Sequence, residues 1–113
     1  MTLQKITPKE LYEKLQSNEK LTLVDVRSEE KYKEYHIEFP LTESRNIPKT
    51  LIFGLEETGD DLSLPKEREI VVTCTTGNSA AKCANILDSH GMKVTVLEGG
   101  LTAWKEYVNS LHS

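Results

Sequence analysis

The chain has 113 residues, about the length of one compact domain, and its 37% apolar and 28% charged residues are typical of a soluble globular protein. A formal charge of −4, from 14 basic and 18 acidic residues without a basic cluster, argues against a nucleic-acid or anionic-membrane partner. No apolar run is long enough to span a bilayer and the first residues lack the apolar core of a signal peptide, so we predict one cytoplasmic domain over residues 1–113.

Strand-like and helix-like segments alternate along the chain. In chain order, the sequence predicts a strand over 3–6, a helix over 8–17, a strand over 21–26, a helix over 29–35, a weak strand over 44–47, a weak helix over 50–57, a turn over 58–61, a strand over 69–74, a helix over 79–90, a strand over 93–97 and a helix over 101–111. Thr7 and Glu10 form a capping box before the first helix, and Ser28 can cap the second. Gly91 is a typical stop after the helix that ends at His90.

Several of the predicted strands are nearly continuous apolar runs, which is typical of strands that are covered on both faces. Such strands in alternation with helices predict an α/β domain, with a mostly parallel five-stranded sheet flanked by helices on both faces. Ligands of sheets of this kind bind beyond the carboxyl ends of the strands. Cys74 lies at such an end, directly after the run EIVVT.

The segment TTGNS after Cys74 can offer hydrogen-bond donors to the cysteine sulfur. Gly77 can adopt a positive φ and Asn78 tolerates one, so backbone N–H groups of this segment and of the following helix can converge on one anion. Donors of this kind favour a thiolate, which indicates a nucleophilic or sulfur-carrying cysteine. The alternative is a buried structural cysteine, the interpretation that we prefer for Cys83 on the apolar face of its helix.

The remaining cysteine and histidine positions show no pattern of a metal or redox centre. The two cysteines do not form a Cys-x-x-Cys pair, and a disulfide framework is not expected from two cysteines. His36, His90 and His112 have no metal-ligand spacing with each other or with the cysteines. We therefore expect no metal site and no dithiol redox centre at these residues.

Four short motifs occur in order along the chain: DVR followed by EY and HI within residues 25–37, NIP at 46–48, CTTGNSA at 74–80 and LEGGLTAW at 97–104. In this order they resemble the motifs of the single-domain proteins of the rhodanese-like family. The resemblance covers nearly the whole chain. It implies the fold of that family, a parallel α/β sheet flanked by helices.

The resemblance also implies a sulfurtransferase. In the family, the loop cysteine takes sulfane sulfur from thiosulfate or a persulfide, becomes a persulfide itself, and passes the sulfur to cyanide, a small thiol or a protein thiol. This implies Cys74 as the catalytic residue, ping-pong kinetics and no cofactor. The implied substrate-binding groups are amides and hydroxyls of the next five residues, Thr75, Thr76, Gly77, Asn78 and Ser79. The choice of donor and acceptor and the oligomeric state stay open.

Two other parts of the resemblance imply structural roles. Asp25 and Arg27 match a motif that is mainly structural in the family, so we expect them in a buried or semi-buried charge network. Gly99, Gly100 and Trp104 match a packing motif near the cysteine loop.

The loop departs from the family pattern at Ser79, where many members carry arginine. Exchange of a charge-assisted hydrogen bond for a neutral one weakens the binding of an oxyanion donor by roughly tenfold. Lys82 is a candidate for a substitute charge, although a solvated surface lysine is the simpler interpretation. The segment over residues 38–44 is longer than is usual in the family, so the resemblance does not predict the path of this segment or the pocket wall beside it.

Two other functions fit part of this pattern. The loop of dual-specificity phosphatases and arsenate reductases is one residue longer and ends in arginine, whereas no arginine follows Cys74 in this loop, so doubly charged phosphate would lack its bidentate partner. A non-catalytic rhodanese-like module that docks a partner protein is the main alternative. The presence of Cys74 and Gly77 in a loop of the right length favours chemistry.

Overall fold

The computed structural model describes residues 4–17, 21–39, 42–54 and 68–111. The strands in these ranges are β1 (Gln4–Ile6), β2 (Leu21–Asp25), β3 (Glu43–Asn46), β4 (Glu69–Thr73) and β5 (Lys93–Leu97). They form a five-stranded sheet in the order β1-β5-β4-β2-β3, and every neighbouring pair is parallel. The predicted α/β class and parallel sheet are confirmed.

Five helices connect or follow these strands in the described ranges, and they are α1 (Pro8–Gln16), α2 (Glu29–Glu34), α3 (Lys49–Phe53), α5 (Asn78–Ser89) and α6 (Gly100–Leu111). Most predicted elements agree with these bounds to within one residue. The weak helix predicted over 50–57 is the exception, because α3 ends at Phe53 with Gly54 as its C-cap. The rest of that prediction and the turn over 58–61 lie outside the described residues.

The helix starts follow from local hydrogen bonds that the sequence predicts. At α1, Thr7 Oγ1 accepts from the Glu10 backbone N–H at 3.1 Å, and the Glu10 carboxylate accepts from the Thr7 backbone N–H at 3.1 Å. At α2, Ser28 Oγ accepts from the Lys31 backbone N–H at 3.4 Å. None of the helices in the described part of the chain is both long and apolar enough to cross a membrane.

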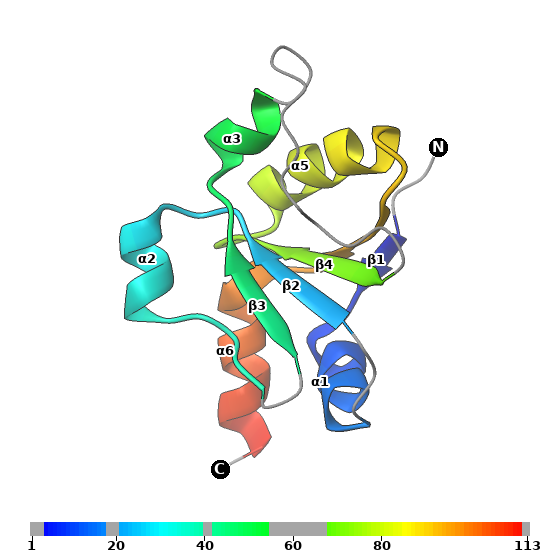
Figure 1. Ribbon diagram of the computed structural model, residues 1–113. Coiled ribbons are helices and arrows are strands. Elements are labelled where there is room, and N and C mark those ends of the chain that lie inside the picture. Colours follow the sequence, from blue (N-terminus) through cyan, green and yellow to red (C-terminus); the bar gives the residue numbers. More distant parts are fainter. Residues whose placement is uncertain (1–3, 18–20, 40–41, 55–67, 112–113) are drawn as a thin grey trace.

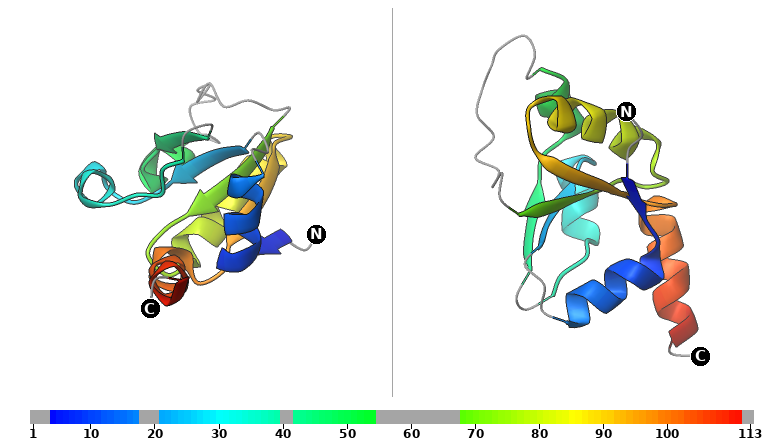
Figure 2. Two further views of the ribbon diagram at one scale, coloured as in Figure 1. Left: turned by 90° about the horizontal axis from the view of Figure 1, so that it is seen from below. Right: turned by 90° about the vertical axis from the view of Figure 1, so that its right-hand side faces the viewer.

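Helices cover both faces of the sheet, as predicted. Figure 1 shows α3 and α5 on one side of the strands and α1 and α6 on the other, and the right-hand view in Figure 2 agrees. Each face carries its own buried cluster. The cluster on the α5 side includes Val24, Val26, Ile47, Ile52, Ile70, Val72, Cys74, Ala80, Cys83, Ala84, Leu87, Met92 and Val96. The cluster on the α1 side includes Ile6, Leu11, Leu15, Leu21, Leu23, Ile37, Val71, Leu97, Leu101 and Trp104.

The register of the central strands brings three chain segments to one end of the sheet. Asp25 at the end of β2 lies opposite Asn46 of β3 on one side and Thr73 of β4 on the other. The three strands therefore end level with one another. The segments that follow β2, β3 and β4 meet at this carboxyl edge, where α2, α3 and α5 begin.

Candidate active site

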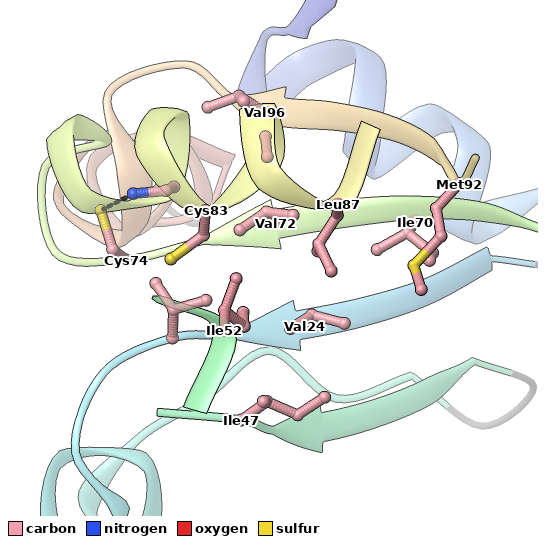
Figure 3. Packing of buried hydrophobic residues seen from close by; sticks show 13 residues of the cluster. Val24, Ile47, Ile52, Ile70, Val72, Cys74, Cys83, Leu87, Met92 and Val96 are labelled. Carbon is pink, nitrogen blue, oxygen red and sulfur yellow. Dashed lines mark hydrogen bonds between the residues drawn. The ribbon is translucent and has the colours of Figure 1, made fainter. Parts of the chain in front are cut away.

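Cys74 follows β4 directly and is 5% exposed at the carboxyl edge of the sheet. Its Sγ accepts the backbone N–H of Gly77 at 2.9 Å and that of Ala80 at 3.4 Å. The dashed line at Cys74 in Figure 3 marks the second of these contacts. Gly77 has a φ of 102° and is the N-cap of α5, so the chain turns around the sulfur before the helix begins. Backbone donors of this kind stabilise an anionic acceptor more than a neutral one.

The predicted amide donors are only partly brought to the sulfur. Of the five residues from Thr75 to Ser79, Gly77 alone has a described N–H contact with Sγ, and the second donor is Ala80, one residue beyond the predicted set. Asn78 is exposed in the first turn of α5. The other three residues, Thr75, Thr76 and Ser79, line the pocket beside Cys74.

The first turn of α6 is hydrogen-bonded to the backbone of the Cys74 loop. The backbone N–H of Leu101 donates to the Cys74 carbonyl at 2.8 Å, and that of Thr102 donates to the Thr75 carbonyl at 3.1 Å. Gly100 permits this approach, because a Cβ at that position would lie 2.5 Å from the Cys74 carbonyl oxygen. Trp104, one turn later, is 3% exposed in the cluster on the α1 side. The motif with Gly100 and Trp104 thus has the packing role that its resemblance implies.

A nearly buried ion pair fixes the segment after β2. Arg27 Nε lies 3.0 Å from both carboxylate oxygens of Asp25, and Arg27 Nη2 lies 2.7 Å from Oδ2. The two side chains are 10% and 5% exposed. Arg27 Nη2 also donates to the Tyr35 carbonyl, and the Asn46 side-chain amide donates to the carbonyls of Asp25 and Arg27. This is the semi-buried charge network expected for these residues, and it leaves the Arg27 guanidinium paired.

A pocket of about 430 Å³ lies against Cys74. Its described lining residues come from three connections and are Val26, Arg27, Ser28, Lys31, Pro48, Lys49, Thr50, Cys74, Thr75, Thr76 and Ser79. Lys31 and Lys49 were not among the predicted site residues. Both lysines follow strands of the parallel sheet, whose carboxyl ends share one edge, and the strand order places β2 directly beside β4 and β3 beside β2.

The pocket lining is positively charged. Its described residues include Lys31 and Lys49 together with the paired Arg27, and none of these described residues is acidic. Lys82 is exposed and does not line this pocket, which agrees with the simpler interpretation of a surface lysine. The described residues of the long segment 38–44 do not line it either, since four of them border a different hollow beside Tyr32.

Cys83 lies in the same cluster as Cys74 but is fully buried, and Figure 3 shows both thiols on the α5 side of the sheet. Burial, and secondly the neighbouring Cys74, raises the pKa of Cys83 to about 11, while Lys49 opposes the rise. The expectation that Cys83 fills the core is confirmed. In the described ranges, no group of three or more His, Cys, Asp or Glu side chains is arranged to hold a metal ion.

Comparison with known proteins gives a consistent set of similarities. The model of the rhodanese-like domain family matches residues 7–107. MoeZ of Mycobacterium tuberculosis, named a probable adenylyltransferase/sulfurtransferase, is 37% identical over 101 residues, which cover 88% of this chain and 24% of MoeZ. This chain therefore spans about a quarter of that relative.

Two relatives of similar length extend over almost all of the chain. YtwF of Bacillus subtilis, provisionally named a sulfurtransferase, is 28% identical over 106 residues, which cover 93% of each protein. The crystal structure of a rhodanese-like domain protein from Staphylococcus aureus superposes with a TM-score of 0.72 at 28% identity, over 90% of this chain and 91% of that chain. The similarity thus includes both the sequence and the arrangement of the sheet and helices.

Proposed function

This chain belongs to the rhodanese-like domain family, and we propose that it is a sulfurtransferase that carries sulfane sulfur covalently on Cys74. The proposal rests on the surroundings of the Cys74 sulfur. This sulfur accepts hydrogen bonds from two backbone N–H groups and lies beside an open, positively charged pocket. The names of MoeZ and YtwF support the same general activity.

In the first half-reaction, the Cys74 thiolate attacks the outer sulfur of a donor. With a persulfide donor R–S–SH, a new S–S bond forms to Cys74 while the donor's own S–S bond breaks, and the thiolate RS⁻ leaves with the electron pair. With thiosulfate, the leaving group is sulfite. The N–H groups of Gly77 and Ala80 would hold negative charge on the sulfur before the attack.

In the second half-reaction, the acceptor attacks the outer sulfur of the Cys74 persulfide. A thiolate acceptor becomes a persulfide and cyanide becomes thiocyanate, and Cys74 recovers its thiolate in both cases. Because the first product leaves before the acceptor arrives, the kinetics should be ping-pong. The sulfur travels on the protein itself, so the reaction requires no metal or organic cofactor.

The test is the mass of the protein after exposure to a donor. We expect incubation with glutathione persulfide or thiosulfate to add one sulfur atom, and later addition of cyanide to remove it and release thiocyanate. The added sulfur should be absent in Cys74→Ala and present in Cys83→Ala, which is the matched control. Intact-mass spectrometry without reductant measures both.

The same measurement distinguishes the main alternative, a rhodanese-like module that only docks a partner. Absence of added sulfur with either donor would favour that module. Sulfur that remains in Cys74→Ala would show a carrier at another position and would contradict the proposal.

A further inference from the structure

Building on the proposed function, we propose that Lys31 and Lys49 are specificity-determining residues of the Cys74 pocket, and that they select sulfur donors whose carboxylates lie several bonds away from the transferred sulfur. The chemical class is a small persulfide of a carboxylate-bearing thiol, of which glutathione persulfide is the probe.

The two lysines reach the pocket from different connections. Lys31 belongs to α2, after β2, and Lys49 is the first residue of α3, after β3, whereas Cys74 follows β4. Their backbones are fixed, because the Lys49 N–H donates to the Val26 carbonyl at 3.0 Å and the Lys31 N–H donates to Ser28 Oγ. The positive charges therefore belong to the pocket wall and not to the cysteine loop.

Neither ammonium group pairs with a carboxylate in the described part of the chain. Other basic side chains in that part do form ion pairs. Lys33, two residues from Lys31, pairs with Glu29 at 2.9 Å, and Lys14 pairs with Glu69 at 3.1 Å. None of the described residues that line the pocket is acidic. Within the described ranges, the two lysines of its lining thus have no carboxylate partner and are available to an anionic ligand.

The size of the pocket, and the origin of its lysines in α2 and α3 and not in the cysteine loop, indicate where the ligand is negative. A volume of about 430 Å³ corresponds to roughly fourteen water molecules at about 30 Å³ each, and thiosulfate would fill only a small part of it. Thiosulfate also carries its charge next to the transferred sulfur, where Thr75, Thr76 and Ser79 offer neutral groups. A larger donor with remote carboxylates can place its outer sulfur at Cys74 and its charges at the lysines.

The experiment measures sulfur loading of Cys74 against donor concentration for three donors: glutathione persulfide, the persulfide of glutathione diethyl ester, and thiosulfate. The variants are Lys31→Gln, Lys49→Gln and the double variant, and Lys82→Gln is the control because Lys82 is exposed but does not line the pocket. All of them should keep the thermal unfolding midpoint of the unmodified protein, since these lysines are exposed.

For glutathione persulfide, we expect the half-saturating concentration to rise about threefold in each single variant and about tenfold in the double variant, with little change in the maximal rate. Loading from the diethyl ester should be unchanged in every variant, and Lys82→Gln should match the unmodified protein. Added salt should weaken the preference for the charged donor, because exposed charges are screened.

Equal use of glutathione persulfide and its diethyl ester by the unmodified protein would overturn the inference, as would a double variant with unchanged loading. An equal loss with thiosulfate would overturn the assignment to remote carboxylates. In all three cases Cys74 would still take up sulfur, so the proposed function would stand. Failure of all three donors to load Cys74 would instead contradict the proposed function, on which this inference rests.

Discussion

Cys74 and Cys83 are chemically identical side chains in one buried cluster, but their surroundings differ. Cys74 borders a pocket, and its sulfur accepts two backbone N–H groups. Cys83 is fully buried on the inner face of α5, and burial raises its pKa to about 11. The thiolate is the reactive form of cysteine, and with this pKa only about 0.1% of the Cys83 thiol is ionised at pH 8. Backbone donors at Cys74 and burial at Cys83 therefore give the two thiols different reactivity.

At the scale of single residues, we expect iodoacetamide at pH 8 to alkylate Cys74 alone in the folded protein. Cys83 should react only after unfolding in guanidinium, because the raised pKa keeps it protonated and no solvent reaches it. Peptide mapping by mass spectrometry identifies the modified residue, and Cys83→Ala should give the same single adduct as the unmodified protein. Equal rates for both cysteines in the folded protein would contradict this expectation.

Among the elements, the contact between α6 and the Cys74 loop is the one that most directly joins the fold to the site. The first turn of α6 donates to the carbonyls of Cys74 and Thr75 and so holds the backbone that carries the nucleophile. The first turn of α5 supplies the Ala80 N–H to the Cys74 sulfur. Gly100 makes the approach of α6 possible, with a φ of 62° and no side chain.

We expect Gly100→Ala to reduce both stability and sulfur loading. The left-handed φ alone should cost about 1–2 kcal/mol, and the new Cβ would lie 2.5 Å from the Cys74 carbonyl oxygen and 2.7 Å from that of Thr75. Gly91→Ala is the matched control, since its φ is 84° but a Cβ there meets nothing within 4 Å. It should lose a similar 1–2 kcal/mol, again about the cost of the φ, and load normally. Urea unfolding and intact mass measure the two effects, and normal loading by Gly100→Ala would contradict the role of this contact.

Across the whole molecule, one sheet joins two hydrophobic clusters. The central strands contribute to both, since Val72 faces the α5 side and Val71 faces the α1 side. All five residues of β2 are buried for the same reason. Neither cluster can lose its packing without exposing the strands that cover the other, so we expect the molecule to unfold as one cooperative unit.

This cooperativity can be tested with a mutation in each cluster and a probe in only one. Leu87 on the α5 side and Leu11 on the α1 side are both fully buried, and each substitution by Ala should lower the free energy of unfolding by about 2–5 kcal/mol. Trp104, the single tryptophan, lies on the α1 side. Within each variant, Trp104 fluorescence and far-UV circular dichroism should give the same urea midpoint. A Trp104 transition that Leu87→Ala leaves unshifted would mean that the two clusters unfold separately.

Much of the fold could be predicted from the sequence because its signals are local. The capping box at Thr7 and Glu10 and the cap at Ser28 depend only on neighbours within one helical turn. The apolar runs predict strands that are covered on both faces, and the position of Cys74 at the end of one of them predicts the edge where a ligand would bind. The need for Gly77 in a left-handed turn is also local, and its φ of 102° agrees.

The order of the strands was decided by the tertiary structure, and it determines which other residues reach Cys74. Lys31 and Lys49 are 43 and 25 positions before the cysteine (74 − 31 and 74 − 49), and no local pattern connects them with it. They line its pocket because β2 lies beside β4, β3 lies beside β2, and the three strands end level with one another. Local rules determine helices, strands and turns, whereas contacts between distant segments depend on how the strands pair to bury their side chains.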